Sequence, residues 1–151
     1  MIDDKKSDRQ QIEDVVTSVA HLQDMKQWEA LESYFVKKPF VDNKALSGEM
    51  PAIMPKKRLI NSWRLEIGNY FYATRHFIRS LAVRRLNSRR AKVTTNVEHV
   101  HYVADRGDRY AWTVKGKIEY ILVKTTNGTW KISQMIFRIT DQMVRPVGGA
   151  A

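Results

Sequence analysis

The spacing of apolar residues predicts helices in the first half of the chain. Over residues 8–24 the apolar side chains recur every three or four positions, which places them on one face of a helix: Ile12, Val15, Val16, Val19 and Leu22. Ser7 or Asp8 can cap the start of this helix. The same period predicts a second, short helix over residues 28–35 and a third over residues 56–69.

The connection between the second and third helices has no clear period. Pro39 is expected to end the second helix, because proline disfavours the helical conformation in the residue before it. Residues 41–55 then contain two prolines and a glycine, so we expect a loop there with at most one short strand.

In the second half of the chain, apolar and polar residues alternate, which predicts strands. Four such segments follow one another: residues 73–83, 92–104, 110–125 and 130–139. Asn127-Gly128 is a strong hairpin signal between the last two. Helices followed by a run of antiparallel strands predict an α+β fold, with three helices on one face of a curved sheet and an apolar pocket between them. We expect one domain over residues 1–151, with an ordered core over about residues 8–140 and flexible tails.

Composition narrows the class of protein. The chain has no cysteine, which excludes disulfides and zinc–thiolate sites. No apolar run approaches the length of about 20 residues that a membrane span needs, and the polar N-terminal segment lacks the apolar core of a signal peptide. A soluble, cytoplasmic protein without a membrane partner is therefore expected.

The formal charge of +10 raises the question of an anionic partner. The densest basic cluster is Arg84–Arg90, which contains Arg84, Arg85, Arg89 and Arg90 around the turn-forming residues Asn87 and Ser88. It can bind an anionic partner, or it can be a solvated hairpin tip whose charges deter aggregation at the sheet edge. No nucleic-acid-binding motif accompanies the cluster, so nucleic acid is not an expected partner.

The histidines are the candidate chemical groups. Alternation from residue 73 places Thr74, His76, Ile78 and Ser80 on one face, and Arg75, Phe77, Arg79 and Leu81 on the other. Because arginine side chains favour water, His76 is expected to point inward. His101 shares a face with Val93, Val97 and Val103, so it is also expected inside. Such histidines are either hydrogen-bonded core residues or functional groups.

Asp24, at the expected end of the first helix, can complete a site with these two histidines. A carboxylate bonded to one ring nitrogen fixes the tautomer and raises the basicity of the other nitrogen. That arrangement suits a general base that removes a proton from carbon. A metal site built from Asp24, His76, His99 and His101 is the weaker alternative, because His99 and His101 are separated along one strand, and no metal is expected.

Three segments resemble SnoaL-like proteins of the NTF2-like superfamily. They are HLQDMKQWEALESYF at residues 21–35, ATRHFIRS at 73–80 and GTWKISQMIFRI at 128–139, and the resemblance spans residues 10–139. It implies a cone-shaped α+β fold with a pocket for a small molecule. No cofactor is expected. The superfamily contains isomerases, dehydratases, hydrolases and non-catalytic modules, so the resemblance implies a fold more strongly than an activity.

Within the superfamily the chain is similar to the scytalone dehydratases, in TRHFIR, in GEMPA at residues 48–52 and in the interval between His76 and His101. The similarity implies that His76 acts as base and then acid of a syn elimination, while Asp24 holds His101 as an ionised pair. Related dehydrochlorinases also use an aspartate–histidine dyad for elimination.

The chain departs from that family at substrate contacts. Gln23 and Asn43 stand where the dehydratases have two tyrosines, and Glu119 aligns with a pocket asparagine. These differences argue against the same substrate. Asn43 and Glu119 are the expected substrate contacts, although Glu119 reaches the pocket only if a bulge near Gly116 switches the faces of its strand.

Two aromatic residues are further candidates for the pocket lining. Trp28 is either core or pocket, and Tyr34 is either a pocket hydroxyl or half-exposed on its helix. On the opposite face, Phe77, Leu81 and Tyr102 form either a homo-oligomer contact, in a dimer or trimer, or scattered surface apolar residues.

The sequence therefore predicts a small cofactor-independent enzyme that catalyses elimination or isomerisation by proton transfer on a small, largely apolar molecule. The first alternative is a non-catalytic ligand-binding or protein-interaction module of the same fold. The second is a binder of an anionic partner through Arg84–Arg90.

Overall fold

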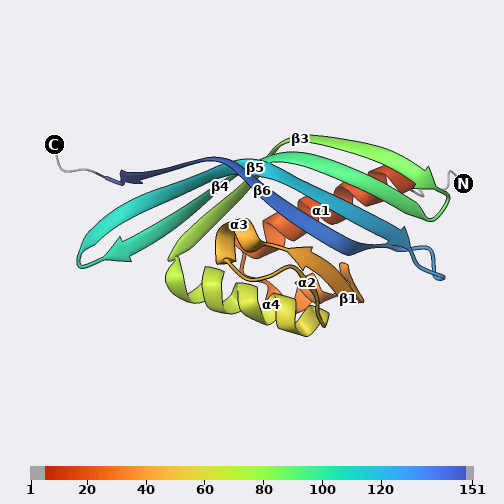
Figure 1. Cartoon of the computed structure of the whole chain (residues 1–151), viewed down its shortest axis with the longest axis horizontal. Coiled ribbons are helices and arrows are strands. Elements are labelled where there is room, and N and C mark those ends of the chain that lie inside the picture. Colours follow the sequence, from red (N-terminus) through yellow and green to blue (C-terminus); the bar gives the residue numbers. More distant parts are fainter. Residues whose placement is uncertain (1–5, 149–151) are drawn as a thin grey trace, which may run out of the picture.

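A curved six-stranded sheet covers the helices in the computed structural model, which describes residues 6–148 (Figure 1). The elements in chain order are α1 (Asp8–Asp24), α2 (Trp28–Glu32), β1 (Phe35–Asp42), α3 (Lys44–Ser47), β2 (Ala52–Ile53), α4 (Lys56–Leu65), a π-helical turn (Glu66–Tyr70), β3 (Ala73–Asn87), β4 (Arg90–Asp105), β5 (Asp108–Lys124) and β6 (Trp130–Pro146). The predicted α+β fold with helices on one face of a curved sheet is confirmed. The expectation of flexible tails falls partly on residues 1–5 and 149–151, which lie outside the described residues.

The first helix forms as its apolar stripe predicts. Ser7 caps α1 by accepting a hydrogen bond from the backbone N–H of Gln10 at 3.2 Å. Ile12, Val16 and Val19 are at most 1% exposed, because this face of α1 packs against the sheet. The helix ends where Lys26 adopts a left-handed conformation with φ of 56°, so Asp24 lies at the end of the helix that faces β3.

The second helix is shorter than predicted, and a strand follows it. α2 ends at Glu32, and β1 runs parallel to β6 and antiparallel to β2. Pro39 lies inside β1, where the pairing with β6 is irregular between Phe35 and Phe40. A proline cannot donate to a strand ladder, so it is tolerated at such an irregularity. The expectation of a helix through residue 35 was wrong.

The connection to α4 contains the expected short strand, β2, and also a four-residue helix, α3, which was not predicted. The residues described therefore form four α-helices rather than three. The third predicted helix corresponds to α4 and the π-helical turn that continues it to Tyr70. None of the helices described has the length and apolar character that crossing a membrane requires.

Strands β3 to β6 form an antiparallel sheet in the order of the chain. The Asn127-Gly128 hairpin is confirmed, with Gly128 at φ 88° and its N–H bonded to the Thr125 carbonyl at 3.0 Å. β3 and β6 run beyond their predicted ends, to Asn87 and Pro146.

An extra residue in β3 changes which of its later side chains point inward. In β3 the pairing shifts between Ile78 and Ser80, so Arg79 is the extra residue. Leu81 consequently packs against the core, and its predicted place on the outer face was wrong. Phe77 remains outside the core, with Arg79 stacked on its ring. Assembly of the protein through this outer face stays a prediction.

The basic cluster Arg84–Arg90 spans the turn between β3 and β4. The guanidinium of Arg85 lies 3.5 Å from a carboxylate oxygen of Asp8 and stacks over the ring of Trp130. Arg89 donates a hydrogen bond to the Lys124 carbonyl at 3.3 Å. Two of the four arginines therefore hold the hairpin against the rest of the fold.

Candidate active site

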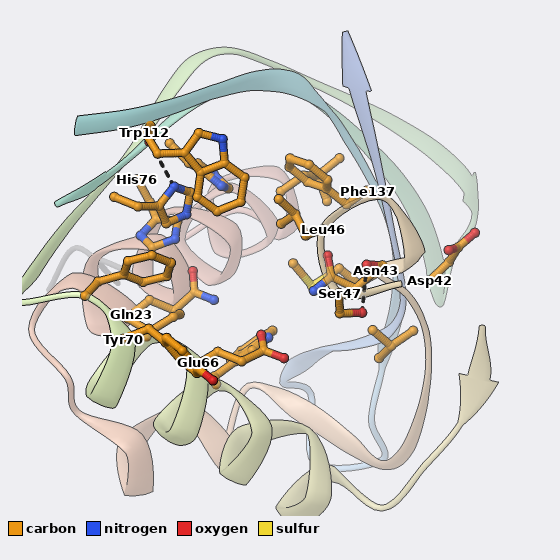
Figure 2. A pocket seen from close by; sticks show the side chains of 18 residues that line it. Gln23, Asp42, Asn43, Leu46, Ser47, Glu66, Tyr70, His76, Trp112 and Phe137 are labelled. Atoms are coloured by element: carbon orange, nitrogen blue, oxygen red, sulfur yellow. Dashed lines mark hydrogen bonds between the residues drawn. The ribbon is translucent and has the colours of Figure 1, made fainter. Parts of the chain in front are cut away.

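A cavity of about 400 Å³ lies between the concave face of the sheet and the helices (Figure 2). Its apolar lining comprises Val41, Leu46, Trp63, Ile67, Phe71, Trp112, Ile118, Met135 and Phe137. Its polar lining comprises Gln23, Asp42, Asn43, Ser47, Glu66, Tyr70, His76, His99 and His101. A mostly apolar cavity with a few converging polar groups is the usual form of a small-molecule site.

Asp24 is bound tightly to the start of β3. Its carboxylate accepts a hydrogen bond from the backbone N–H of His76 at 2.8 Å and one from the Thr74 hydroxyl at 3.0 Å. A third, very short contact joins Asp24 Oδ1 to Nδ1 of His76. Three donors therefore hold this carboxylate, with bonds to both of its oxygens.

The contact with Asp24 determines the tautomer of the neutral His76 ring. A carboxylate accepts but does not donate, so Nδ1 of His76 carries the proton. Nε2 then holds a free lone pair and is the ring nitrogen available to a ligand in the cavity, which His76 lines. The His76 side chain is only 4% exposed, so solvent has little access to this nitrogen.

The partner of Asp24 differs from the one that the family resemblance implied. Asp24 binds His76 and not His101, whose Nδ1 instead donates to the Trp112 carbonyl at 3.1 Å. The reason is the strand order: α1 packs against β3, which carries His76, whereas His101 lies one strand further away on β4, opposite Thr74. The predicted ionised pair of Asp24 with His101 was therefore wrong.

The other two histidines of the cavity are held in their neutral form. Burial lowers the pKa of His101 to about 4, although its hydrogen bond to the Trp112 carbonyl acts in the opposite direction. Burial also lowers the pKa of His99 well below its usual value, and the nearby rings of His76 and His101 lower it further. The ring of His99 stacks on Phe137, with 5.5 Å between their centroids.

The lowered pKa of His101 predicts a loss of stability in mild acid. The unfolded chain takes up a proton near pH 6.5, whereas the folded protein resists it down to about pH 4, so unfolding becomes easier as the pH falls through this range. Relative to His101→Gln, wild type is expected to lose about 3 kcal/mol more of its free energy of unfolding between about pH 7 and pH 4. Urea unfolding at several pH values measures this loss of stability.

His21→Gln, at an exposed position on α1, is the control, and its free energy of unfolding should depend on pH as that of wild type does. An unchanged slope in His101→Gln contradicts the prediction.

The three histidine rings lie close together, but they do not form a metal site. The ring centroid of His76 is 4.2 Å from that of His99 and 6.1 Å from that of His101. Within residues 6–148, no group of three or more His, Asp or Glu side chains is arranged to hold a metal ion.

The structure brings only some of the predicted substrate contacts to the cavity. Asn43 lines it, whereas Trp28 and Tyr34 lie outside its lining. Glu119 points to the outer face, 3.7 Å from Lys92. The irregularity at Gly116 places the extra residue, Thr140, in β6, so the alternation of β5 continues unbroken. The prediction of Glu119 as a pocket residue was wrong.

Several lining residues were not predicted as site residues. Trp112 and Phe71 flank His101, with ring centroids 4.7 Å from its own. Trp112 lies on the apolar face of β5, so alternation alone could have indicated it. Glu66 lies in the π-helical turn after α4, and no local pattern shows that such a turn faces a cavity.

The fold agrees with comparisons to known proteins. The family model of the SnoaL-like domain matches residues 4–136, so the chain belongs to the SnoaL-like family of the NTF2-like superfamily. A search of curated protein sequences found no match.

Solved structures share the fold at low sequence identity. The protein Kfla4162 from Kribbella flavida is 24% identical with a TM-score of 0.81, over 90% of this chain and 93% of the other. A proposed scytalone dehydratase from Novosphingobium aromaticivorans is 21% identical with a TM-score of 0.77, over 95% of each chain. A type 2 hexachlorocyclohexane dehydrochlorinase, LinA, is 13% identical with a TM-score of 0.78, over 94% of this chain and 90% of the other. At these identities the likeness shows the fold.

Proposed function

We propose that the protein is a small-molecule enzyme in which Asp24 and His76 remove a proton from carbon, in an elimination or an isomerisation. The observation that carries this proposal is the orientation of His76. Its Nδ1 is held by a carboxylate that three donors fix in place, and its Nε2 is free at a mostly apolar cavity.

The chemistry follows from this geometry. Nε2 of His76 takes the proton, and the electron pair of the broken C–H bond forms a new double bond. In an elimination, a leaving group departs with its bonding electrons, and the imidazolium can return the proton to it. In an isomerisation, the proton returns to another carbon. Asp24 stabilises the imidazolium that forms between the two steps, because its charge lies directly at Nδ1.

The neighbouring rings support the proposal. His99 and His101 stay neutral because burial lowers their pKa values, so they do not repel the imidazolium form of His76. The names of two proteins with the same fold, a dehydrochlorinase and a proposed dehydratase, both describe eliminations. Homo-oligomer formation and a cytoplasmic location remain predictions.

A probe substrate tests the proposal without knowledge of the natural one. In 5-nitrobenzisoxazole, removal of the proton on carbon breaks the ring N–O bond and gives a coloured cyanophenolate. Wild type is expected to open the ring faster than buffer of the same pH. Asp24→Asn is expected to lower kcat by about 10- to 100-fold, because an amide cannot stabilise the imidazolium as a carboxylate does.

Asp14→Asn is the matched control for this experiment. Asp14 lies on the same helix as Asp24 and forms an ion pair with Lys6, which precedes the helix. It does not line the cavity. It should retain the wild-type rate, and thermal unfolding of all three proteins shows whether they are folded. Absence of ring opening above buffer contradicts the proposal, and it favours a non-catalytic module in which the histidines are core residues.

A further inference from the structure

The charge of the cavity is opposite to that of the chain. The protein contains 26 lysines and arginines, yet none of those in the described residues lines the cavity. Its ionisable lining consists of Asp42, Glu66, Tyr70 and the three histidines, two of which are neutral. A bound carboxylate or phosphate would therefore find no lysine or arginine side chain to pair with.

Glu66 is the carboxylate best placed to contact a ligand. It lies in the π-helical turn that follows α4, and its side chain points to the cavity from the side opposite the strands (Figure 2). No ion pair between residues 6–148 includes it. Burial raises the pKa of Glu66, and the charge of Glu49 raises it further, which is the behaviour of a carboxyl group without a cationic neighbour.

Gln23 supplies a second, independent indication of a ligand. It is only 7% exposed, and its amide forms no hydrogen bond with the part of the chain that the structure describes. No fully enclosed polar side-chain atom in this part of the chain lacks a partner, so the amide atoms of Gln23 must be open to the cavity. In the view of Figure 2, the side chain of Gln23 lies between His76 and Glu66. A buried amide that meets only the cavity is suited to bind a polar group of a ligand.

We propose that this site selects an uncharged or cationic ligand with a hydrogen-bond donor, a hydroxyl or an ammonium group, which Glu66 accepts. Gln23 binds the polar part of the ligand between this group and the carbon that faces His76. Glu66 is then the specificity-determining residue, and anionic ligands are excluded. The inference rests on the proposed function only in that it concerns the same cavity.

Three naphthalene probes of similar size test the inference. They are 2-naphthylmethylamine, which is a cation at neutral pH, 2-naphthol, which is uncharged, and 2-naphthoic acid, which is an anion. Calorimetric titration of wild type is expected to show binding of the amine and the naphthol at least about tenfold tighter than that of the naphthoate.

Glu66→Gln is expected to reduce this preference to within about threefold, mainly by weakening the amine and strengthening the naphthoate. The control is Glu29→Gln, which makes the same change of charge at an exposed position of α2 outside the cavity, and which should keep the wild-type preference. Thermal unfolding of both variants establishes that they are folded.

The outcomes separate this inference from the proposed function. If naphthoate binds as tightly as the amine, or if Glu66→Gln keeps the full preference, the inference fails while the proton-transfer proposal stands. If none of the probes binds, the inference also fails, and the ring opening of 5-nitrobenzisoxazole decides the proton-transfer proposal by itself.

Discussion

Replacement of His76 by glutamine is expected to lower the rate of ring opening of 5-nitrobenzisoxazole by about 100-fold or more. The glutamine amide can still donate a hydrogen bond to Asp24. Its side chain is close in size to that of histidine, so the packing of the neighbouring residues should be preserved. It has no basic nitrogen, however, and cannot take the proton. The loss should therefore appear in kcat rather than in KM, because the apolar cavity still binds the nitrobenzisoxazole substrate.

His101→Gln is the informative comparison for this prediction. His101 lines the same cavity, but its Nδ1 is bound to the Trp112 carbonyl and no carboxylate holds it. Its replacement should cost less than about tenfold in kcat. Equal losses in the two variants would mean that the cavity needs both rings for its shape, and would contradict the assignment of His76 as the base.

Gly116→Ala is expected to lower the free energy of unfolding by about 3 kcal/mol. A Cβ atom at this position would lie 2.2 Å from the carbonyl oxygen of Arg138, a backbone atom that cannot move without disturbing β6. The contact arises because β6 carries the extra residue Thr140 just beyond this point. Urea unfolding of wild type and variant measures the change.

Gly68→Ala is the matched control for the packing at Gly116. A Cβ atom there would meet Trp28 at 3.7 Å, which is an ordinary contact, and the backbone of Gly68 does not have a positive φ. This variant should be as stable as wild type or more stable by up to about 1 kcal/mol, because alanine restricts the unfolded chain. If Gly116→Ala is equally well tolerated, the close approach of β5 and β6 at the bulge is not rigid.

Local sequence patterns were sufficient to predict the features that depend on residues close together in the chain. The stripe of Ile12, Val16 and Val19 predicted α1, and alternation predicted that His101 points inward from its strand, β4. His76 was correctly expected to point inward, because the alternation of β3 is regular up to Ile78. The fold class and the histidine side of the cavity could therefore be predicted from the sequence.

Features that depend on strand pairing could not be predicted in this way. Trp130 and Ile132 point inward, and so does Phe137, because Ser133 is an extra residue that reverses the alternation between them. Leu81 was placed on the wrong face for the same reason, since Arg79 is an extra residue of β3. The effect of one extra residue on every later side chain is invisible until the partner strand is known.

The choice of partner for Asp24 also depended on tertiary structure. Alternation showed which way His76 and His101 point, but the distance of each from the end of α1 follows from the strand order. The strand β1 was missed because Pro39 suggested a helix end and a loop, while its ladder partner β6 lies about 95 residues later in the chain.

A double-mutant cycle tests most directly whether Asp24 and His76 act as one unit. The rates of ring opening are measured for wild type, Asp24→Asn, His76→Gln and the variant with both changes. If Asp24 acts through His76, its replacement should cost about 10- to 100-fold in wild type but less than about twofold once His76 is glutamine. If Asp24→Asn lowers the rate by the same factor in both backgrounds, the carboxylate acts independently and the proposed Asp24–His76 base is wrong.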